Sequence, residues 1–182
     1  HGVKTVEVPW ARPGAGFTLL MEAFILVLVQ GGMTAAQAAR LIGEHDTRLW
    51  RVLQHYVEKA RSEADFSEVT AIGVDETSRS KGHHYISVFM DLDEDKRRVL
   101  FATEGKDAST VRRFREDLEA HGGQAEQVKD ACLDMSQAFI RGLEGQFPDA
   151  QKTFDNFHLM QLLTKAVDEV RRAESSRLRT AQ

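Results

Sequence analysis

Two aspartates, each at the end of a short apolar segment, are the side chains of this sequence best suited to chemistry. Asp75 follows Ala71–Val74, and Asp134 follows Ala131–Leu133. If both segments are neighbouring strands, the two carboxylates lie a few ångströms apart and repel each other unless a cation screens them, which makes the pair a natural site for hard divalent ions. Two such ions, roughly 3.5–4 Å apart, can activate the attacking oxygen and stabilise the leaving oxygen in phosphodiester chemistry.

Two further polar side chains, Asp155 and His158, follow the short extended segment Gln151–Phe154. At a strand end next to the aspartate pair, a histidine can contact a DNA phosphate or orient a carboxylate. A capping role is the alternative for Asp155, which precedes a helical pattern, and for Asp134, which precedes Ser136.

The adjacent histidines His83 and His84 do not predict a metal pair, because neighbouring residues of a strand point to opposite faces. The one cysteine, Cys132, is expected to be a small buried strand residue without a disulfide partner.

A second candidate site lies in two short helical segments between residues 34 and 57. Small side chains at Ala38 and Ala39, with a turn at Gly43, are typical of a helix-turn-helix, whose second helix enters the major groove of DNA. An ordinary helical hairpin that only packs is the alternative. The positions expected to reach base edges or phosphates are Thr47, Arg48, Arg51 and Gln54.

The elements that must position these residues follow from hydrophobic periodicity and turn residues. Helices are predicted for residues 19–30, 35–42, from a cap at Asp46 or Thr47 to about 62, 108–120, 136–144 and from 157 into the tail. Strands are predicted for residues 70–76, 84–90, 98–103, 127–133 and 151–154, with a short edge strand at 3–8. The fold class is therefore α/β, with a mixed sheet in the order βββαβαβα after a three-helix unit.

Composition limits the classes of protein that fit. The 182 residues are 42% hydrophobic and carry a net charge of −4, which is typical of a globular domain and argues against polyanion binding over the whole surface. The longest apolar run, Phe17–Val29, is too short to span a bilayer and contains Glu22. With a single cysteine and no signal peptide, a reducing cytoplasmic setting and no membrane partner are expected. A chain that begins with His1 rather than Met is expected to be a fragment, a processed product or an incomplete reading frame.

Five blocks, in this order along nearly the whole chain, resemble the DDE transposases of bacterial insertion sequences, specifically the ISL3 family. The blocks are Val8–Arg12, the helix-turn-helix, Ile72–Glu76, Leu133–Phe139, and Phe154–His158 followed by Ala166–Arg172. This resemblance implies a ribonuclease H-like (RNase H-like) core in which Asp75 and Asp134 are the first and second acidic metal ligands. It further implies Mg²⁺, or Mn²⁺, as the ion, and cleavage and joining of DNA strands at transposon ends.

The resemblance places the third acidic ligand, a glutamate, well downstream. Glu169 lies 35 positions after Asp134, but it is a weaker candidate because it falls in a helix, Ala166–Arg172, that the family places before a helical insertion. The alternative is a solvated charge on a helix face. If that glutamate is missing, the 182-residue chain is expected to be poor or inactive in strand transfer.

The resemblance also predicts the domains. Residues 1–16 form an arm at the end of a missing zinc-binding segment, 17–66 a DNA-binding helix-turn-helix domain, and 67–182 a C-terminally truncated catalytic domain. His1 could be the last ligand of that segment, but one cysteine cannot complete a four-ligand site, so no zinc is expected here.

The expected partners are double-stranded DNA, both transposon terminal inverted repeats and target DNA, and further copies of the chain when two ends are synapsed. The expected location is the bacterial cytoplasm, at the nucleoid when DNA is bound. The alternative is a DNA-binding regulator or inactive transposase remnant with a non-catalytic RNase H-like domain. A stand-alone RNase H-like nuclease fits less well because it leaves the helix-turn-helix unexplained.

Overall fold

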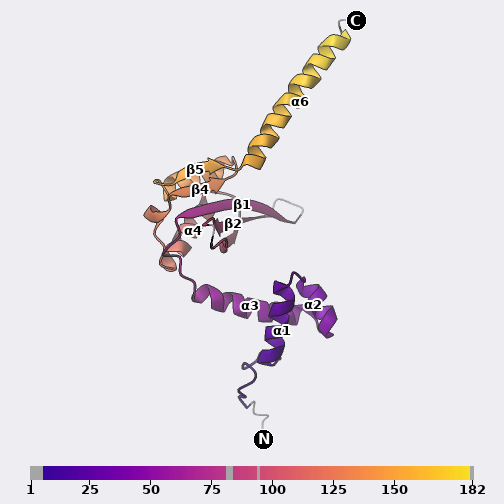
Figure 1. The fold of residues 1–182 in the computed structure, drawn as a ribbon, viewed down its shortest axis with the longest axis vertical. Helices are drawn as coiled ribbons and strands as arrows, with labels where there is room; N and C mark the ends of the chain where they lie inside the picture. The colour runs from indigo at the N-terminus through magenta and orange to yellow at the C-terminus, as the bar shows by residue number, and fades with distance from the viewer. Residues whose placement is uncertain (1–5, 81–83, 94, 181–182) are drawn as a thin grey trace. The chain divides into compact units, whose positions relative to one another are not determined.

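A computed structural model describes residues 6–80, 84–93 and 95–180. The chain divides into two compact units, His1–Ala64 and Asp65–Gln182 (Figure 1). His1, His83 and residues 3–5 of the expected edge strand lie outside the described residues, and residues 6–8 form no strand, so that part of the edge-strand prediction was wrong.

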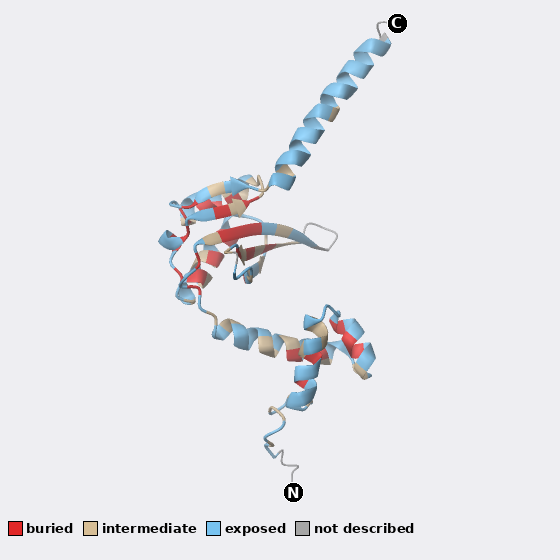
Figure 2. Ribbon diagram, in the orientation of Figure 1, coloured by how far each residue is buried: buried red, intermediate tan, exposed pale blue. Residues whose placement is uncertain are grey.

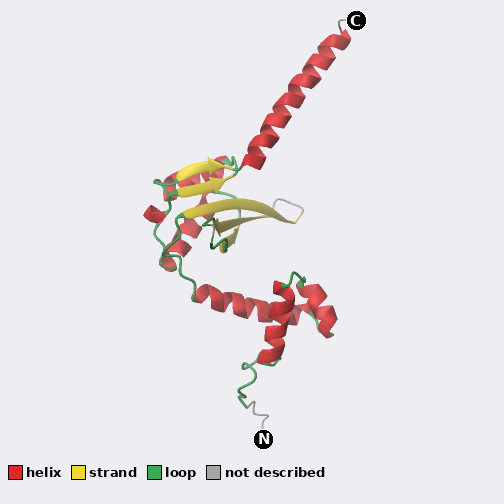
Figure 3. Ribbon diagram, viewed as in Figure 1, coloured by secondary structure: helices red, strands yellow, loops and turns green. Residues whose placement is uncertain are grey.

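The first unit is helical, and the second begins with three strands, after which helices and strands alternate (Figure 3). The helices are α1 (Leu19–Gln30), α2 (Ala35–Ile42), α3 (Asp46–Ser62), α4 (Ala108–Ala120), the short 3₁₀ helix η1 (Ala125–Gln127), α5 (Gln137–Gln146) and α6 (Asn156–Thr180). The strands are β1 (Ala71–Ser80), β2 (His84–Asp91), β3 (Val99–Glu104), β4 (Asp130–Leu133) and β5 (Gln151–Phe154).

Local hydrogen bonds determine where the helices of the first unit begin and end. Thr34 and Gln37 form a reciprocal capping box at the start of α2, and Gly43 ends it with a left-handed φ of 73°. Helix α3 begins at Asp46 after His45, which makes no side-chain capping bond. The prediction that Asp46 or Thr47 caps α3 was therefore wrong.

The core of the first unit lies where the three helices meet (Figure 2). Its buried residues are Ile25, Ala38, Ala39, Leu49 and Val52. The two alanines are small enough to let α2 approach the other helices closely, so the packing depends on their size.

A buried charge, Glu22, joins the arm to this unit. Its carboxylate accepts two hydrogen bonds from Arg12, at 2.9 and 2.8 Å, and one from the Tyr56 hydroxyl at 2.8 Å. Burial opposes ionisation, but these hydrogen bonds outweigh it and lower the pKa of Glu22. The hydrogen bond between Tyr56 and Glu22 raises the pKa of the Tyr56 hydroxyl.

The second unit is built on a five-stranded mixed sheet in the order β3-β2-β1-β4-β5. Strand β2 pairs antiparallel with β1 and β3, whereas β4 pairs parallel with β1 and β5. The mixed α/β class expected from the sequence is confirmed. The strand predicted for 127–133 is shorter, because η1 occupies Ala125–Gln127 and β4 begins at Asp130.

The two faces of the sheet differ. Val74 pairs with Phe89, whose ring stacks on Phe114 of α4 at 4.3 Å between centroids, so α4 covers the face on which these strand side chains lie. Because side chains alternate along a strand, Asp75 and Cys132 belong to the opposite face.

Helix α6 is exposed along most of its length in Figure 2. Of the described helices, none combines the length and apolar character needed to cross a membrane.

Candidate functional site

One register row crosses three neighbouring parallel strands, β1, β4 and β5. The parallel β1–β4 and β4–β5 ladders end at Val74, Leu133 and Phe154, whereas β1 itself continues to Ser80 against β2. The next residue on each strand is an aspartate: Asp75, Asp134 and Asp155. Because neighbouring strands lie about 4.8 Å apart, the row places the backbones of the three aspartates side by side. The β4–β5 hydrogen-bond ladder continues into this row, since the Asp155 amide donates to the Leu133 carbonyl at 3.0 Å.

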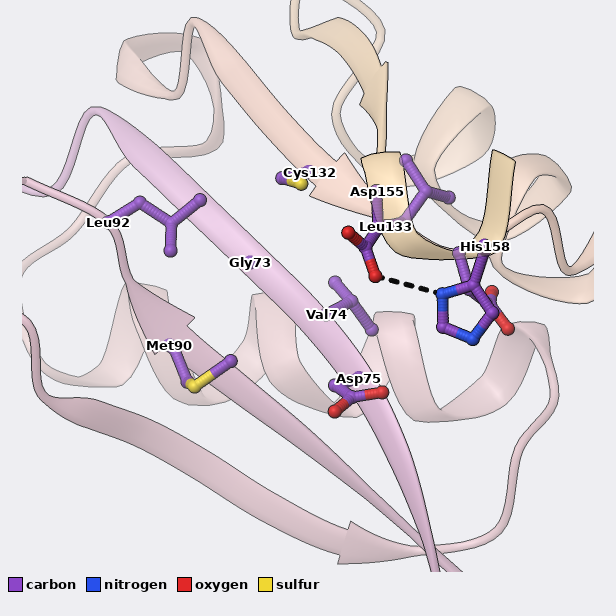
Figure 4. Close-up of a pocket in the computed structure, with 10 residues that line it drawn as sticks. Gly73, Val74, Asp75, Met90, Leu92, Cys132, Leu133, Asp155 and His158 are labelled. Carbon is purple, nitrogen blue, oxygen red and sulfur yellow. Dashed lines mark hydrogen bonds and ion pairs between the residues drawn. The ribbon is translucent and has the colours of Figure 1, made fainter. Parts of the chain in front are cut away.

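The three aspartates border a hollow of about 170 Å³ (Figure 4). The residues that line it are Gly73, Val74, Asp75, Met90, Leu92, Cys132, Leu133, Asp134, Asp155 and His158. The structure thus brings together Asp75, Asp134, Asp155 and His158, four of the residues that the sequence singled out.

The first two carboxylates are only partly used by local hydrogen bonds. Oδ1 of Asp75 accepts from the Glu76 amide at 2.8 Å, and Oδ1 of Asp134 accepts from the Ser136 amide at 2.9 Å. The turn-forming role that the sequence left open for Asp134 is therefore present. Its second oxygen has no hydrogen-bond partner among the described residues, which leaves it available to a ligand.

Asp155 connects the sheet to α6. Its Oδ1 accepts from the Phe157 amide at 3.0 Å, and its Oδ2 lies 2.9 Å from Nδ1 of His158 (Figure 4, dashed). The Phe157 amide first, and His158 second, lower the pKa of Asp155. Asp155 therefore caps α6 and also holds the His158 ring at the hollow.

Sequence reasoning missed three residues that line the hollow: Gly73, Met90 and Leu92. A Cβ at Gly73 would lie 3.0 Å from the Leu92 side chain, so glycine lets Leu92 cover β1. Cys132 lines the hollow half-buried, although it was expected to be buried. Burial, and then the charge of Asp155, raise the pKa of its thiol. For Gly73 a signal was available in the sequence: side chains alternate along a strand, so position 73 shares a face with Asp75.

Glu169 is not brought to this hollow. It lies on α6, eleven residues beyond His158, and therefore about 16 Å farther along the helix axis at 1.5 Å per residue. Within the part of the chain that the structure describes, no three His, Cys, Asp or Glu side chains form a group that could hold a metal ion.

The four expected DNA-contacting residues of α3 differ in their surroundings. Thr47 and Arg51 are exposed, and the exposed Gln54 donates to Glu58 at 2.7 Å. Arg48 is half-buried and already bonded within the protein, as it donates to the Gly16 carbonyl at 2.8 Å.

Comparisons with known proteins agree with this organisation. A family model for DDE transposases of the ISL3 type, described as "Transposase", matches residues 72–182. A second, described as "Helix-turn-helix domain of transposase family ISL3", matches residues 6–57.

Individual relatives are transposases by name. The transposase for insertion sequence element IS1557 of Mycobacterium tuberculosis is 29% identical over 178 residues, covering 94% of this chain and 38% of the relative. The transposase for IS1001 of Bordetella parapertussis is 31% identical over 118 residues, covering 64% of this chain and 28% of the relative. The chain therefore spans well under half the length of these curated relatives.

A solved structure also aligns with the chain. A chain in the cryoEM structure of the simian T-cell lymphotropic virus intasome in complex with PP2A regulatory subunit B56 gamma aligns with 72% of this chain and 51% of its own length, at 14% identity and a TM-score of 0.34.

The family match covers more than half of the chain and confirms the resemblance read from its five sequence blocks. The chain belongs to the ISL3 family of insertion-sequence transposases.

Proposed function

We propose that this chain binds transposon-end DNA through residues 17–66 and contributes an RNase H-like catalytic domain, residues 67–182, to metal-dependent cleavage and transfer of DNA strands. One observation carries the proposal: Asp75 and Asp134 follow the last register pair of two parallel strands and line the same hollow. The family match supports the same activity.

The donor set suits Mg²⁺ or Mn²⁺. Both aspartates offer hard oxygen ligands, and Asp134 keeps one oxygen without a partner among the described residues. Mg²⁺ usually takes one or two carboxylates, retained waters and substrate phosphates, which fits a pair of aspartates at an open hollow of about 170 Å³. When bound, the ion supplies Lewis-acid stabilisation of the phosphoryl oxygens.

The remaining residues at the hollow position the substrate. Asp155 holds His158 through the contact at 2.9 Å, so the ring can contact a DNA phosphate or orient a neighbouring carboxylate. The substrates are the terminal inverted repeats and target DNA. Joining two ends requires more than one copy of the chain in the synapsed complex, at the nucleoid in the cytoplasm.

A third acidic ligand completes the site in this proposal. Glu169 is the weaker candidate, because the structure places it on α6 away from the hollow. This placement favours a second candidate function, a DNA-binding regulator or inactive transposase remnant whose RNase H-like domain does not catalyse.

Calorimetric titration with Mn²⁺ distinguishes the two. The parent chain is expected to bind Mn²⁺, and the double variant D75A/D134A is expected to lose that binding. D149A is the matched control, since Asp149 is an exposed aspartate outside the hollow. A double variant that binds Mn²⁺ as tightly as D149A would remove the two-aspartate site and leave the regulator as the better proposal.

A further inference from the structure

A second hollow, of about 210 Å³, lies between the arm and α3 in the first unit. Its lining residues are Arg12, Pro13, Gly14, Ala15, Gly16, Arg48, Arg51 and Val52. Three arginines therefore surround one loop, which is an arrangement that suits an anion.

Two of these arginines are bound to other groups of the protein. Arg12 pairs with the buried Glu22 at 2.8 Å. Arg48 pairs with Glu44 at 2.5 Å, and its guanidinium lies 4.3 Å from the Phe17 ring centre. Both side chains thus hold the walls of the hollow in place.

Arg51 differs from its two neighbours. It is exposed and has no hydrogen-bond or ion-pair partner among the described residues, so its guanidinium keeps all five donors for a ligand. The loop offers further donors. Gly14 and Gly16 have left-handed φ angles of 71° and 72°, and their amides have no partner in the described chain. Backbone amides in turns of alternating handedness bind anions.

Two hydrogen bonds hold the loop in this conformation. The Ala15 amide donates to the Arg12 carbonyl at 3.1 Å, which closes a turn, and the Arg48 guanidinium donates to the Gly16 carbonyl at 2.8 Å. Because the Gly16 carbonyl already accepts a hydrogen bond from Arg48, its oxygen repels an incoming anion less. The loop therefore presents donors rather than acceptors to a ligand.

We propose that this hollow binds one phosphodiester group of duplex DNA, with Arg51 as its charged contact and the Gly14–Gly16 loop as its backbone contact. The proposal rests on DNA binding by the helix-turn-helix and adds to it. Arg51 neutralises a phosphate, and Arg48, expected from the sequence to touch DNA, instead ties the loop to α3. A phosphate fits better than a base edge because it accepts hydrogen bonds from both the guanidinium fork and the loop amides.

The first test uses inorganic phosphate and the whole ¹⁵N-labelled chain. Titration is expected to shift the amide resonances of Gly14 and Gly16 in the parent, and R51Q is expected to lose most of that shift. R40Q is the matched control, because Arg40 is an exposed arginine of the same unit outside the hollow. If the amides do not respond, or respond equally in R51Q and R40Q, the phosphate site is wrong.

The second test measures duplex binding against salt concentration. Each phosphate contact contributes about 0.9 to the slope of log K against log salt, so R51Q is expected to lower the slope by about that amount. R40Q is expected to change it by much less.

The two proposals can fail separately. A parent chain that binds no duplex even at low salt overturns the proposed DNA-binding function, whatever the phosphate titration shows. A parent that binds duplex with a slope unaffected by R51Q overturns only the phosphate site.

Discussion

The guanidinium of Arg12 binds the buried carboxylate of Glu22 through two hydrogen bonds, at 2.9 and 2.8 Å. The arm before α1 is therefore attached to the helical unit by an ion pair whose acidic partner is fully shielded from water. Removing one member of a buried pair costs more than the pair itself contributes, because the other charge is left without compensation.

R12A is expected to destabilise the first unit by about 3 kcal/mol, the cost typical of breaking a buried ion pair on one side. Urea unfolding followed by tryptophan fluorescence measures this, because Trp10 and Trp50 both lie in that unit. Y56F removes one hydrogen bond to the same carboxylate and is expected to cost less, about 1.5 kcal/mol. An R12A variant as stable as the parent would show that the Arg12–Glu22 ion pair contributes nothing to the stability of the unit.

Acid is expected to weaken the same unit through Glu22. Its pKa lies below the ordinary value of 4.5 in the folded chain, so below pH 4.5 the unfolded chain binds more protons than the folded one. The contribution of Glu22 is complete above pH 4.5 and is lost as the pH falls through the folded-state pKa. Unfolding midpoints measured between pH 6 and pH 3 are expected to fall less steeply in E22Q. Parallel curves for the two proteins would contradict this.

Two glycines of α5 form a matched pair for testing the α4–α5 contact. A Cβ at Gly142 would lie 2.7 Å from Val111, whereas a Cβ at Gly145 meets nothing within 4 Å. G142A is expected to lower stability by about 1–3 kcal/mol through overpacking. G145A is expected to raise it by about 0.5–1 kcal/mol, because alanine is the better helix former. If thermal unfolding shows that G142A is more stable than G145A, helices α4 and α5 separate easily.

Glu169 and Asp75 are expected to differ in metal binding. E169Q should leave Mn²⁺ affinity unchanged, because its carboxylate lies on α6 about 16 Å along the axis from His158. D75A alone is expected to weaken that affinity at least tenfold, since the pair supplies the charge at the hollow. The measurement is Mn²⁺ titration calorimetry on the three proteins. A loss of affinity in E169Q comparable with that in D75A would make Glu169 a ligand.

Local signals in the sequence were enough for several elements. The bounds predicted for α2, α4 and β5 are those observed. For α2, a capping threonine and a terminal glycine mark the two ends, and both act through neighbours within a few residues. Where the local signal was ambiguous the prediction failed, as at 127–129: Gln127 ends the 3₁₀ helix η1, and β4 begins only at Asp130.

Residue types and spacing were enough to select the side chains that could carry chemistry. An aspartate follows each of the segments 71–74, 131–133 and 151–154, of which the first two are apolar, and a histidine lies three positions after the last aspartate. Long-range packing brought Asp75, Asp134 and Asp155 into one register row and left Glu169 away from it. It also bonded Arg48 inside the protein, whereas Arg51 has no partner among the described residues. The difference comes from distance along the chain. Capping and periodicity act within a few residues, whereas strand register and the partners of a long side chain depend on packing between segments far apart in sequence.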